Sequence, residues 1–322
     1  MVTSSPSTPR RVVVLGTGGT ISGRSDRGGD NIGYTAGEVA VADLLGGIEA
    51  PEGVTLAAEQ VAQADSKDMS FAIWRALALR CSHWLAAPDV AGLVITHGTD
   101  TLEETAFLLQ SVLAPAKPVV LTCAMRPASA LSPDGPQNLR DAVAVAATPG
   151  ARGVTAVCAG TVHGAFDVQK VHTYRLDAFA SGDAGPVGYV EEGSVRRARE
   201  WPGADADAAR NPDDLPEDEA AWPRVEIVTS HAGAGAAVIR ALRNDASAAS
   251  PLRGLVIAAT GNGTVHQALE AAALEAQEAG IAVLRATRCA SGRILAKPGD
   301  RLRDAGGLTP VKARIALMLE LL

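Results

Sequence analysis

The chain has few cysteines and no metal-binding pattern, and both observations restrict the class of protein to which it can belong. Four cysteines are widely spaced without a C-x-x-C pair: Cys81, Cys123, Cys158 and Cys289. Three of them lie in apolar segments, so we expect free, buried thiols in a reducing cytoplasm instead of disulfides. The six histidines have none of the spacings of a zinc site, so neither a metal nor another cofactor is expected.

The sequence also lacks a membrane span, a secretory leader and a basic stripe. No apolar run reaches the roughly 18 residues of a membrane helix. Residues 1–10 are rich in Ser, Thr and Pro without an apolar core, which indicates a flexible arm and no signal peptide. The net charge is −7, so neither nucleic acid nor an anionic membrane is an expected partner.

What is present first is an alternation of short β-branched runs with helical patterns. We predict strands at residues 11–15, 91–96, 118–122 and 154–158, and helices at residues 70–84, 102–113 and 138–147. This order predicts an α/β fold with a mainly parallel sheet and helices on both of its faces.

A shorter α/β series follows a polar segment. Residues 191–223 have no sustained periodicity and are predicted to be an exposed linker. After them we predict strands at residues 225–229, 254–259 and 281–286, and helices at residues 234–242, 266–279 and 311–322. The 322 residues are therefore predicted to form a larger N-terminal α/β domain, residues 11–190, and a smaller C-terminal α/β domain, residues 224–322.

Two glycine-flanked threonines follow predicted strands. Thr20 ends the run VVVLGTGGT, and Thr99 ends the run LVITHGT. In an open parallel sheet, ligands bind beyond the carboxyl ends of the strands, and glycines let a substrate approach the backbone. The two hydroxyls, the second with Asp100 beside it, therefore indicate a nucleophilic enzyme. The alternative for Thr99 and Asp100 is helix capping, with Asp100 and Glu103 as a capping box.

The glycines at residues 16–20 do not form a nucleotide-binding loop. The dinucleotide fingerprint needs glycine where Ile21 stands, and the phosphate loop needs lysine where Arg24 stands. Residues 25–34 are instead polar and rich in glycine, which is typical of a mobile lid, and Tyr34 is its one residue with a proton to exchange. The alternative is an ordinary surface loop.

A threonine nucleophile needs a base, and Lys170 is the candidate. It follows the predicted strand at residues 154–158 and a glycine turn, so it can reach the same crevice. A neighbouring carboxylate and burial can tune the proton affinity of a lysine. The alternative is a surface lysine. No G-x-S-x-G elbow occurs, so the usual serine hydrolase layout is absent.

Several motifs resemble those of the bacterial-type L-asparaginases. They are TGGTI at residues 17–21, THGTDTLEET at 96–105, AMRP at 124–127, DGPQN at 134–138 and GNG at 261–263. The resemblance runs in order from about Arg11 to the C-terminus. It implies a two-domain α/β amidohydrolase that needs no cofactor, acts on a small amino-acid amide and assembles as a dimer of dimers.

The resemblance also implies roles for particular residues. Thr20 would be the nucleophile, and Tyr34 would assist its proton transfer. A second catalytic set would consist of Thr99, Asp100 and Lys170. Attack on the amide creates an oxyanion that backbone N–H groups on glycine turns can stabilise.

The residues that would bind the substrate are spread over both predicted domains. Ser66 would hold the α-carboxylate, Asp100 would also meet the α-ammonium, and the backbone of three residues would place the amide: Gly19, Gly98 and Ala124. Asn262 is the part of a neighbouring subunit's contribution that the resemblance retains, because the family's acidic residue after the C-domain strand has no clear counterpart.

Lys67 departs from the family, which usually has Gln or Glu there to touch the substrate α-ammonium. A cation at this position repels an ammonium unless it points away or pairs with Asp65 or Asp68. We therefore expect weak amino-acid binding, with a Michaelis constant above about 100 μM.

The sequence thus predicts hydrolysis of L-asparagine to L-aspartate and ammonia through an acyl-enzyme. Two alternatives stay open. One is a glutaminase-asparaginase of broad amide specificity, because one methylene in a pocket is worth only about 1–3 kcal/mol. The other is an amino-acid-binding module that keeps the fold without the chemistry.

Overall fold

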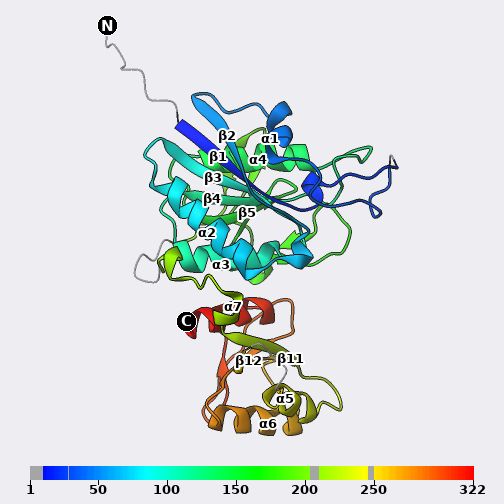
Figure 1. Ribbon diagram of the computed structural model, residues 1–322, viewed down its shortest axis with the longest axis vertical. Coiled ribbons are helices and arrows are strands. Elements are labelled where there is room, and N and C mark those ends of the chain that lie inside the picture. The colour runs from blue at the N-terminus through cyan, green and yellow to red at the C-terminus, as the bar shows by residue number, and fades with distance from the viewer. Residues whose placement is uncertain (1–9, 28, 204–209, 246–249) are drawn as a thin grey trace. The chain divides into compact units, whose positions relative to one another are not determined.

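The protein, analysed as a computed structural model, folds into two compact units, Met1–Asp214 and Leu215–Leu322. The structure describes residues 10–27, 29–203, 210–245 and 250–322. The predicted fold class is confirmed, because a large, mainly parallel sheet with helices forms the first unit and a smaller α/β sheet forms the second (Figure 1).

An eight-stranded sheet of order β10-β9-β6-β5-β4-β3-β1-β2 organises the N-terminal unit. Its parallel strands are β1 (Arg10–Gly18), β2 (Val54–Ala64), β3 (Val90–Thr96), β4 (Pro118–Thr122) and β5 (Gly153–Cys158). Its antiparallel strands are β6 (Thr161–Gly164), β9 (Gly188–Glu191) and β10 (Ser194–Arg197). A separate pair consists of β7 (Gln169–Lys170) and β8 (Phe179–Ala180).

Helices cover this sheet on both faces, as the sequence predicts. The helices α1 (Val41–Leu44) and α4 (Gly135–Ala147) lie on one face, and α2 (Phe71–Ala86) and α3 (Leu102–Leu113) lie on the other (Figure 1). Val12 and Val14 of β1 pack in one cluster with Leu139 of α4. The central strands are buried on both faces, which explains their continuous apolar sequence.

The C-terminal unit has its own sheet and core. Its strands β11 (Arg224–Thr229), β12 (Leu252–Ala259), β13 (Ala282–Thr287) and β14 (Arg303–Asp304) pair in parallel. The helices α5 (Ala237–Arg243) and α6 (Gln267–Glu278) pack on each other and on one face, and α7 (Pro310–Glu320) packs on β11, β12 and β13. Helix α5 begins three residues later than predicted.

The segment predicted as a linker contains regular structure. Strand β10 pairs with β9 as a hairpin at the sheet edge, and the boundary between the units falls at Asp214. Three of the four β10 residues are exposed, so the sequence there shows no apolar alternation. The predicted arm lies outside the described residues except for Arg10, which begins β1.

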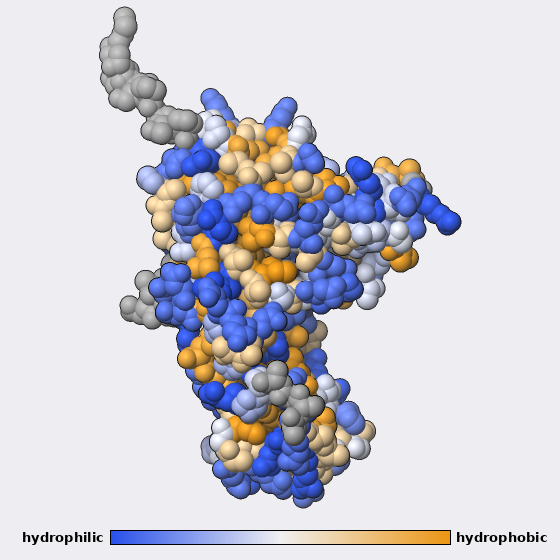
Figure 2. Space-filling view, in the orientation of Figure 1, coloured by the Kyte–Doolittle hydropathy of each residue, from blue (hydrophilic) through white to orange (hydrophobic). Residues whose placement is uncertain are grey.

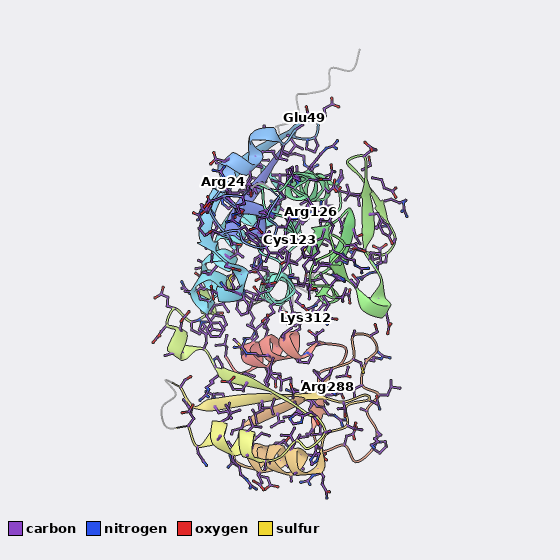
Figure 3. The ribbon with its side chains drawn as sticks, turned by 90° about the vertical axis from the view of Figure 1, so that its right-hand side faces the viewer. Arg24, Glu49, Cys123, Arg126, Arg288 and Lys312 are labelled. Carbon is purple, nitrogen blue, oxygen red and sulfur yellow. The ribbon has the colours of Figure 1, made fainter. Side chains whose placement is uncertain are left out.

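The cysteines are free, as predicted. Cys81, Cys123 and Cys158 are buried and Cys289 is exposed. Cys123 lies inside the N-terminal unit (Figure 3). Across the described ranges, no helix combines the length and apolarity needed to cross a membrane.

The buried face of α4 allows a testable prediction about stability. Leu139 is 1% exposed in the cluster beneath the sheet, so Leu139→Ala is expected to lower the free energy of unfolding by about 2–5 kcal/mol. Leu131, which is 91% exposed, is the matched control, and Leu131→Ala is expected to change it by less than about 0.5 kcal/mol. Urea unfolding measures both, and equal losses would contradict this assignment of the core.

Candidate active site

Two turns meet at the carboxyl edge of the N-terminal sheet. Gly19 follows β1 with φ +84°, and a Cβ atom on it would collide with the backbone of Gly98, which follows β3. A Cβ atom on Gly98 would in turn collide with the side chain of Ser66. Glycines at these two positions therefore let the turns touch, which brings the neighbouring Thr20 and Thr99 to the same edge.

Thr20 forms a hydrogen bond with the tyrosine that the sequence assigns to the lid. It begins the 3₁₀ turn η1 (Thr20–Ser22) and is 6% exposed. Its Oγ1 lies 2.5 Å from the hydroxyl oxygen of Tyr34. Arg24 and Thr35 exchange two backbone hydrogen bonds of 3.0 and 2.9 Å, which close the base of this loop. The closed base holds Tyr34 beside Thr20.

The loop at residues 25–34 has few buried apolar anchors among its described residues. The N–H of Ser25 donates to Oγ of Ser129 at 2.8 Å, and Asp30 accepts from the N–H of Ile32 at 2.9 Å. Ile32 is 79% exposed. Figure 2 shows hydrophobic residues among hydrophilic ones on this projecting part of the N-terminal unit.

Lys170 joins the second threonine to its carboxylate. It lies in β7, and its Nζ donates to Oγ1 of Thr99 at 2.8 Å and to Oδ1 of Asp100 at 2.5 Å. The side chain of Lys170 is 18% exposed and that of Asp100 is 52% exposed, so the ion pair faces solvent on one side. The N–H of Lys170 also donates to Oε1 of Glu103 at 3.3 Å. The structure therefore brings together the three residues predicted as one set.

The capping alternative for Thr99 and Asp100 is wrong. Helix α3 has Thr101 as its N-cap residue, without a capping hydrogen bond from its side chain. The Asp100 carboxylate is turned to Lys170 instead, because the ammonium is a stronger partner than a helix N–H.

Ser66 lies under the same turn. It is 2% exposed, and its Oγ accepts the N–H of Asp100 at 3.1 Å. Its carbonyl oxygen accepts the hydroxyl of Thr101 at 2.8 Å. Ser66 is therefore fixed against residues 98–101.

Lys67 pairs with two flanking carboxylates. Its Nζ lies 2.7 Å from Oδ2 of Asp68 and 3.1 Å from Oδ2 of Asp65, and its side chain is 61% exposed. The hydrogen bonds to Asp68 and then Asp65 raise the pKa of Lys67. From the sequence alone, we expected Lys67 not to repel an ammonium if it paired with Asp65 or Asp68. The structure shows this pairing.

The DGPQN motif holds the turn that follows β4, a role that sequence reasoning missed. The Asp134 carboxylate accepts the N–H of Met125 at 3.0 Å and that of Arg126 at 2.9 Å. Asn138 donates to the carbonyl of Cys123 at 2.9 Å. These bonds fix the backbone on both sides of the buried Ala124. The signal was the Asp-Gly-Pro sequence at the start of α4.

His97 is a second residue without a role in the sequence interpretation. It is fully buried, its Nδ1 lies 2.7 Å from the carbonyl oxygen of Gly98, and its Nε2 lies 2.9 Å from Oγ1 of Thr105. Burial lowers the pKa of His97 to about 4, so the ring is neutral at physiological pH. Its place inside the THGTD motif was the available signal.

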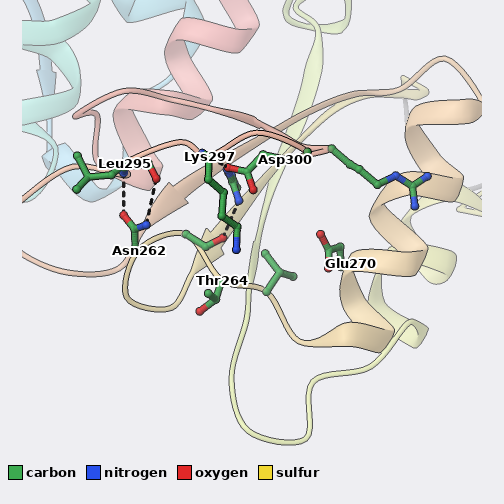
Figure 4. A pocket seen from close by; sticks show the side chains of 11 residues that line it. Asn262, Thr264, Glu270, Leu295, Lys297 and Asp300 are labelled. Carbon is green, nitrogen blue, oxygen red and sulfur yellow. Dashed lines mark hydrogen bonds and ion pairs between the residues drawn. The ribbon is translucent and has the colours of Figure 1, made fainter.

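Asn262 belongs to the C-terminal unit, where its amide holds a loop (Figure 4). Its Nδ2 donates to the carbonyl of Leu295 at 3.1 Å, and its Oδ1 accepts the N–H of Leu295 at 2.7 Å. A cavity of about 310 Å³ beside it is lined by charged residues that include Glu270, Lys297 and Asp300. In the part of the chain that the structure describes, no group of three His, Cys, Asp or Glu side chains is arranged to hold a metal.

These contacts define a class of protein. A hydroxyl paired with a proton-exchanging group, next to a lysine–carboxylate pair beyond the strand ends of an α/β sheet, is an arrangement typical of hydrolases.

Comparison with known proteins identifies the family. The family described as "Asparaginase, N-terminal" matches residues 11–202, and "Glutaminase/Asparaginase C-terminal domain" matches residues 224–322. The chain therefore belongs to the asparaginase family.

Relatives match nearly the whole chain. L-asparaginase 2 of Bacillus subtilis is 34% identical over 320 residues, which cover 96% of this chain and 81% of that protein. The glutaminase-asparaginase of Pseudomonas fluorescens is 33% identical and covers 96% of this chain and 86% of its own length. The crystal structure of a probable cytoplasmic L-asparaginase from Campylobacter jejuni superposes with a TM-score of 0.86 at 33% identity, covering 97% of this chain and 95% of that one.

Acid is expected to weaken the fold, because two buried histidines must stay neutral. Burial lowers the pKa of His97 and of His163 to about 4, whereas an unfolded histidine titrates near 6.5. Since the folded values are depressed, this stabilisation is complete above about pH 6.5 and is lost as the pH falls toward 4. Linkage sets the loss at about 3 kcal/mol for each histidine. Urea unfolding at several pH values measures it.

His163→Asn is the control for this titration. An Asn amide can keep the 2.8 Å hydrogen bond to Ser181 and does not titrate, so the variant should lose less stability between pH 6.5 and 4. A wild-type free energy of unfolding that increases as the pH is lowered from 6.5 to 4 would contradict the prediction.

Proposed function

We propose that this protein hydrolyses L-asparagine to L-aspartate and ammonia, with Thr20 as the nucleophile. The contact that carries the proposal is the 2.5 Å hydrogen bond between the hydroxyls of Thr20 and Tyr34. It gives a weak nucleophile a partner that can receive its proton as attack begins.

In the first half of the reaction, Oγ1 of Thr20 attacks the side-chain amide carbon. Its proton passes through Tyr34 to the departing nitrogen, ammonia leaves, and the aspartyl group stays on Thr20 as an ester. The tetrahedral intermediate carries an oxyanion, which backbone N–H groups of the turns after β1, β3 and β4 can stabilise.

In the second half, water attacks the ester carbonyl and releases aspartate. Water gives its proton to Oγ1 of Thr99 as the hydroxyl hydrogen of Thr99 passes to the Asp100 carboxylate 3.5 Å away, and Lys170 holds both groups in place. The proton returns to Oγ1 of Thr20, which restores the enzyme. The sum is amide plus water to carboxylic acid plus ammonia.

Substrate recognition follows from the charges at the same edge. Asp100 is half-exposed and only one of its carboxylate oxygens contacts Lys170, so the other can meet the α-ammonium. The hydroxyl of Ser66 would bind the α-carboxylate of the substrate. The backbone of Ala124 would help to place the amide. Asn262 would serve the site of a neighbouring subunit.

A glutaminase-asparaginase is the second candidate, and the relative of that name in Pseudomonas fluorescens favours it. The two substrates differ by one methylene, which a pocket discriminates by only about 1–3 kcal/mol.

The proposal extends to assembly and location. We propose a homotetramer, built as a dimer of dimers, in the cytoplasm. Apolar side chains around Lys170 support the assembly, because Phe166, Val171 and Tyr174 are 47%, 47% and 56% exposed in the single chain. The relative of known structure, which is described as a probable cytoplasmic L-asparaginase, and the free thiols support the location.

Removing the Thr20 hydroxyl tests the chemistry. Thr20→Ala is expected to lower ammonia release from asparagine by at least about 1,000-fold, and Thr20→Ser, which keeps a hydroxyl, is expected to retain measurable activity. Ammonia release by the wild type from L-asparagine, L-glutamine and D-asparagine, compared side by side, sets the amide preference. Circular dichroism of each variant verifies the fold.

The covalent intermediate gives a second readout. Rapid quench followed by mass spectrometry of the digested wild type should find an aspartyl ester on the peptide that contains Thr20. Full activity of Thr20→Ala, or an ester on another residue, would remove Thr20 from this role.

Lys67 tests the expectation of weak binding. Because its cation is already paired, we attribute weak binding to a missing contact and not to repulsion. Lys67→Gln, which restores a hydrogen-bonding side chain, should lower the Michaelis constant several-fold with little change in kcat. Lys67→Met, which removes the charge without adding a polar group, should leave it within about twofold. An equal decrease in both variants would show that repulsion is the cause.

A further inference from the structure

Lys170 lies on a short hairpin that is separate from the main sheet of the N-terminal unit. The hairpin consists of β7 and β8, and the N–H of Val171 donates to the carbonyl of Ala178 at 2.8 Å beyond the last paired residues. Each strand has only two residues, and a two-stranded hairpin is at best marginally stable by itself. The contacts that attach this hairpin to the rest of the unit therefore decide where the Lys170 side chain lies.

An ion pair holds the segment that leads into the hairpin. The N–H groups of Asp167 and Val168 both donate to the carbonyl of Gly164, at 3.0 and 2.9 Å, which forms a tight turn directly after β6. The carboxylate of Asp167 pairs with Nη2 of Arg199, 32 positions further along the chain. The side chains of Arg199 and Asp167 are 33% and 26% exposed, so the pair is partly shielded from water. Partial burial makes such a pair stronger than one on the open surface.

The same arginine also holds the segment that leaves the hairpin. Nε of Arg199 donates to the carbonyl of Gly185 at 3.2 Å, a few residues after β8 ends. The backbone of the arginine is itself fixed, because the N–H groups of Ala198 and Arg199 donate to the carbonyl of Val187 at 2.8 and 3.1 Å. One guanidinium group therefore joins both ends of the hairpin to the edge of the main sheet.

The hairpin has other anchors, which act at single points. Nδ1 of His163 lies 2.8 Å from Oγ of Ser181, the residue directly after β8. The N–H of Lys170 donates to Oε1 of Glu103 at 3.3 Å, a long hydrogen bond. With these contacts in place, loss of the guanidinium is expected to loosen the hairpin without unfolding the domain.

We propose that Arg199 is a positioning residue that acts on Lys170 through both ends of the hairpin. By holding Asp167 and the carbonyl of Gly185, it keeps Nζ of Lys170 within hydrogen-bond distance of Thr99. The role rests on the proposed amide hydrolysis, in which the hydroxyl of Thr99 relays the proton of the attacking water. Arg199 itself touches no reacting atom, and its effect passes through the backbone of the hairpin.

Two arginine variants test the role by kinetics. Arg199→Met removes the guanidinium and keeps an unbranched side chain, and we expect kcat for asparagine to fall at least about 10-fold, because a catalytic group displaced by about 1 Å can cost about 100-fold. The Michaelis constant should stay within about threefold, since Ser66 and Asp100, which would bind the substrate, do not lie on the hairpin.

Arg196→Met is the matched control. Arg196 lies in β10 and pairs with Glu191, and both side chains are more than half exposed, so its kcat is expected to stay within about twofold of the wild type. Equal kcat values in the Arg199 and Arg196 variants would overturn the proposal, as would a loss confined to the Michaelis constant.

Asp167→Asn tests whether the ion pair carries the effect. This variant should lower kcat several-fold, and the double variant with Arg199→Met should lose no more than about twofold beyond Arg199→Met alone, because residues in direct contact have non-additive effects. Wild-type kcat in Asp167→Asn would overturn the proposal. So would a double variant in which the two single losses multiply.

Hydrogen exchange followed by mass spectrometry tests the attachment of the hairpin without a substrate. In Arg199→Met, peptides that span residues 165–185 should exchange at least about tenfold faster than in the wild type, and peptides of α3 and α4 should be unchanged. Unchanged exchange in the hairpin, or faster exchange throughout the unit, would overturn the proposal. If the wild type released no ammonia from asparagine, the proposed reaction would fail, and exchange confined to the hairpin would still establish the attachment.

Discussion

The whole site depends on the close approach of two turns at the ends of neighbouring strands. Gly19 after β1 and Gly98 after β3 touch backbone to backbone, and neither position has room for a Cβ atom. Strand order places β1 beside β3, and the hydroxyl of Thr17 donates to the carbonyl of Thr96 at 2.9 Å just before the turns begin. Each nucleophilic candidate follows its glycine by one residue. A larger side chain at either position would therefore separate the two halves of the site.

Behind the turns, a neutral histidine is fully buried, and the Lys170–Asp100 ion pair lies nearer to solvent. His97 lies in the interior with both nitrogens satisfied, whereas Lys170 and Asp100 pair where water still reaches the carboxylate. A buried ion pair is costly to desolvate, but a neutral network with matched donors and acceptors is rigid at little cost. Asp134 and Asn138 give the β4 turn the same kind of support, through bonds to backbone groups.

The fold was largely readable from the sequence where both faces of a strand are buried. Strands β1, β3, β4 and β5 are continuous apolar runs, and their bounds differ from the predicted ones by a few residues at most. Strand β2 lies at the edge of the sheet and alternates between exposed and partly buried residues, and β10 is mostly exposed. Neither has the apolar pattern of a buried strand, because exposure removes the need for it.

The sequence by itself determined the α/β class, the order of the buried strands and of the longer helices, the glycine turns, and the motifs that carry Thr20 and Thr99. Those features are local, because they depend on periodicity and on residues adjacent in the chain. Only the tertiary structure decided the partners. Lys170 reaches Thr99 across 71 positions, and Lys67 pairs with the carboxylates that flank it. Asp100 pairs with Lys170 and does not cap α3. Such contacts exist only once the sheet has closed, since closure sets the distance between side chains that the chain itself keeps apart.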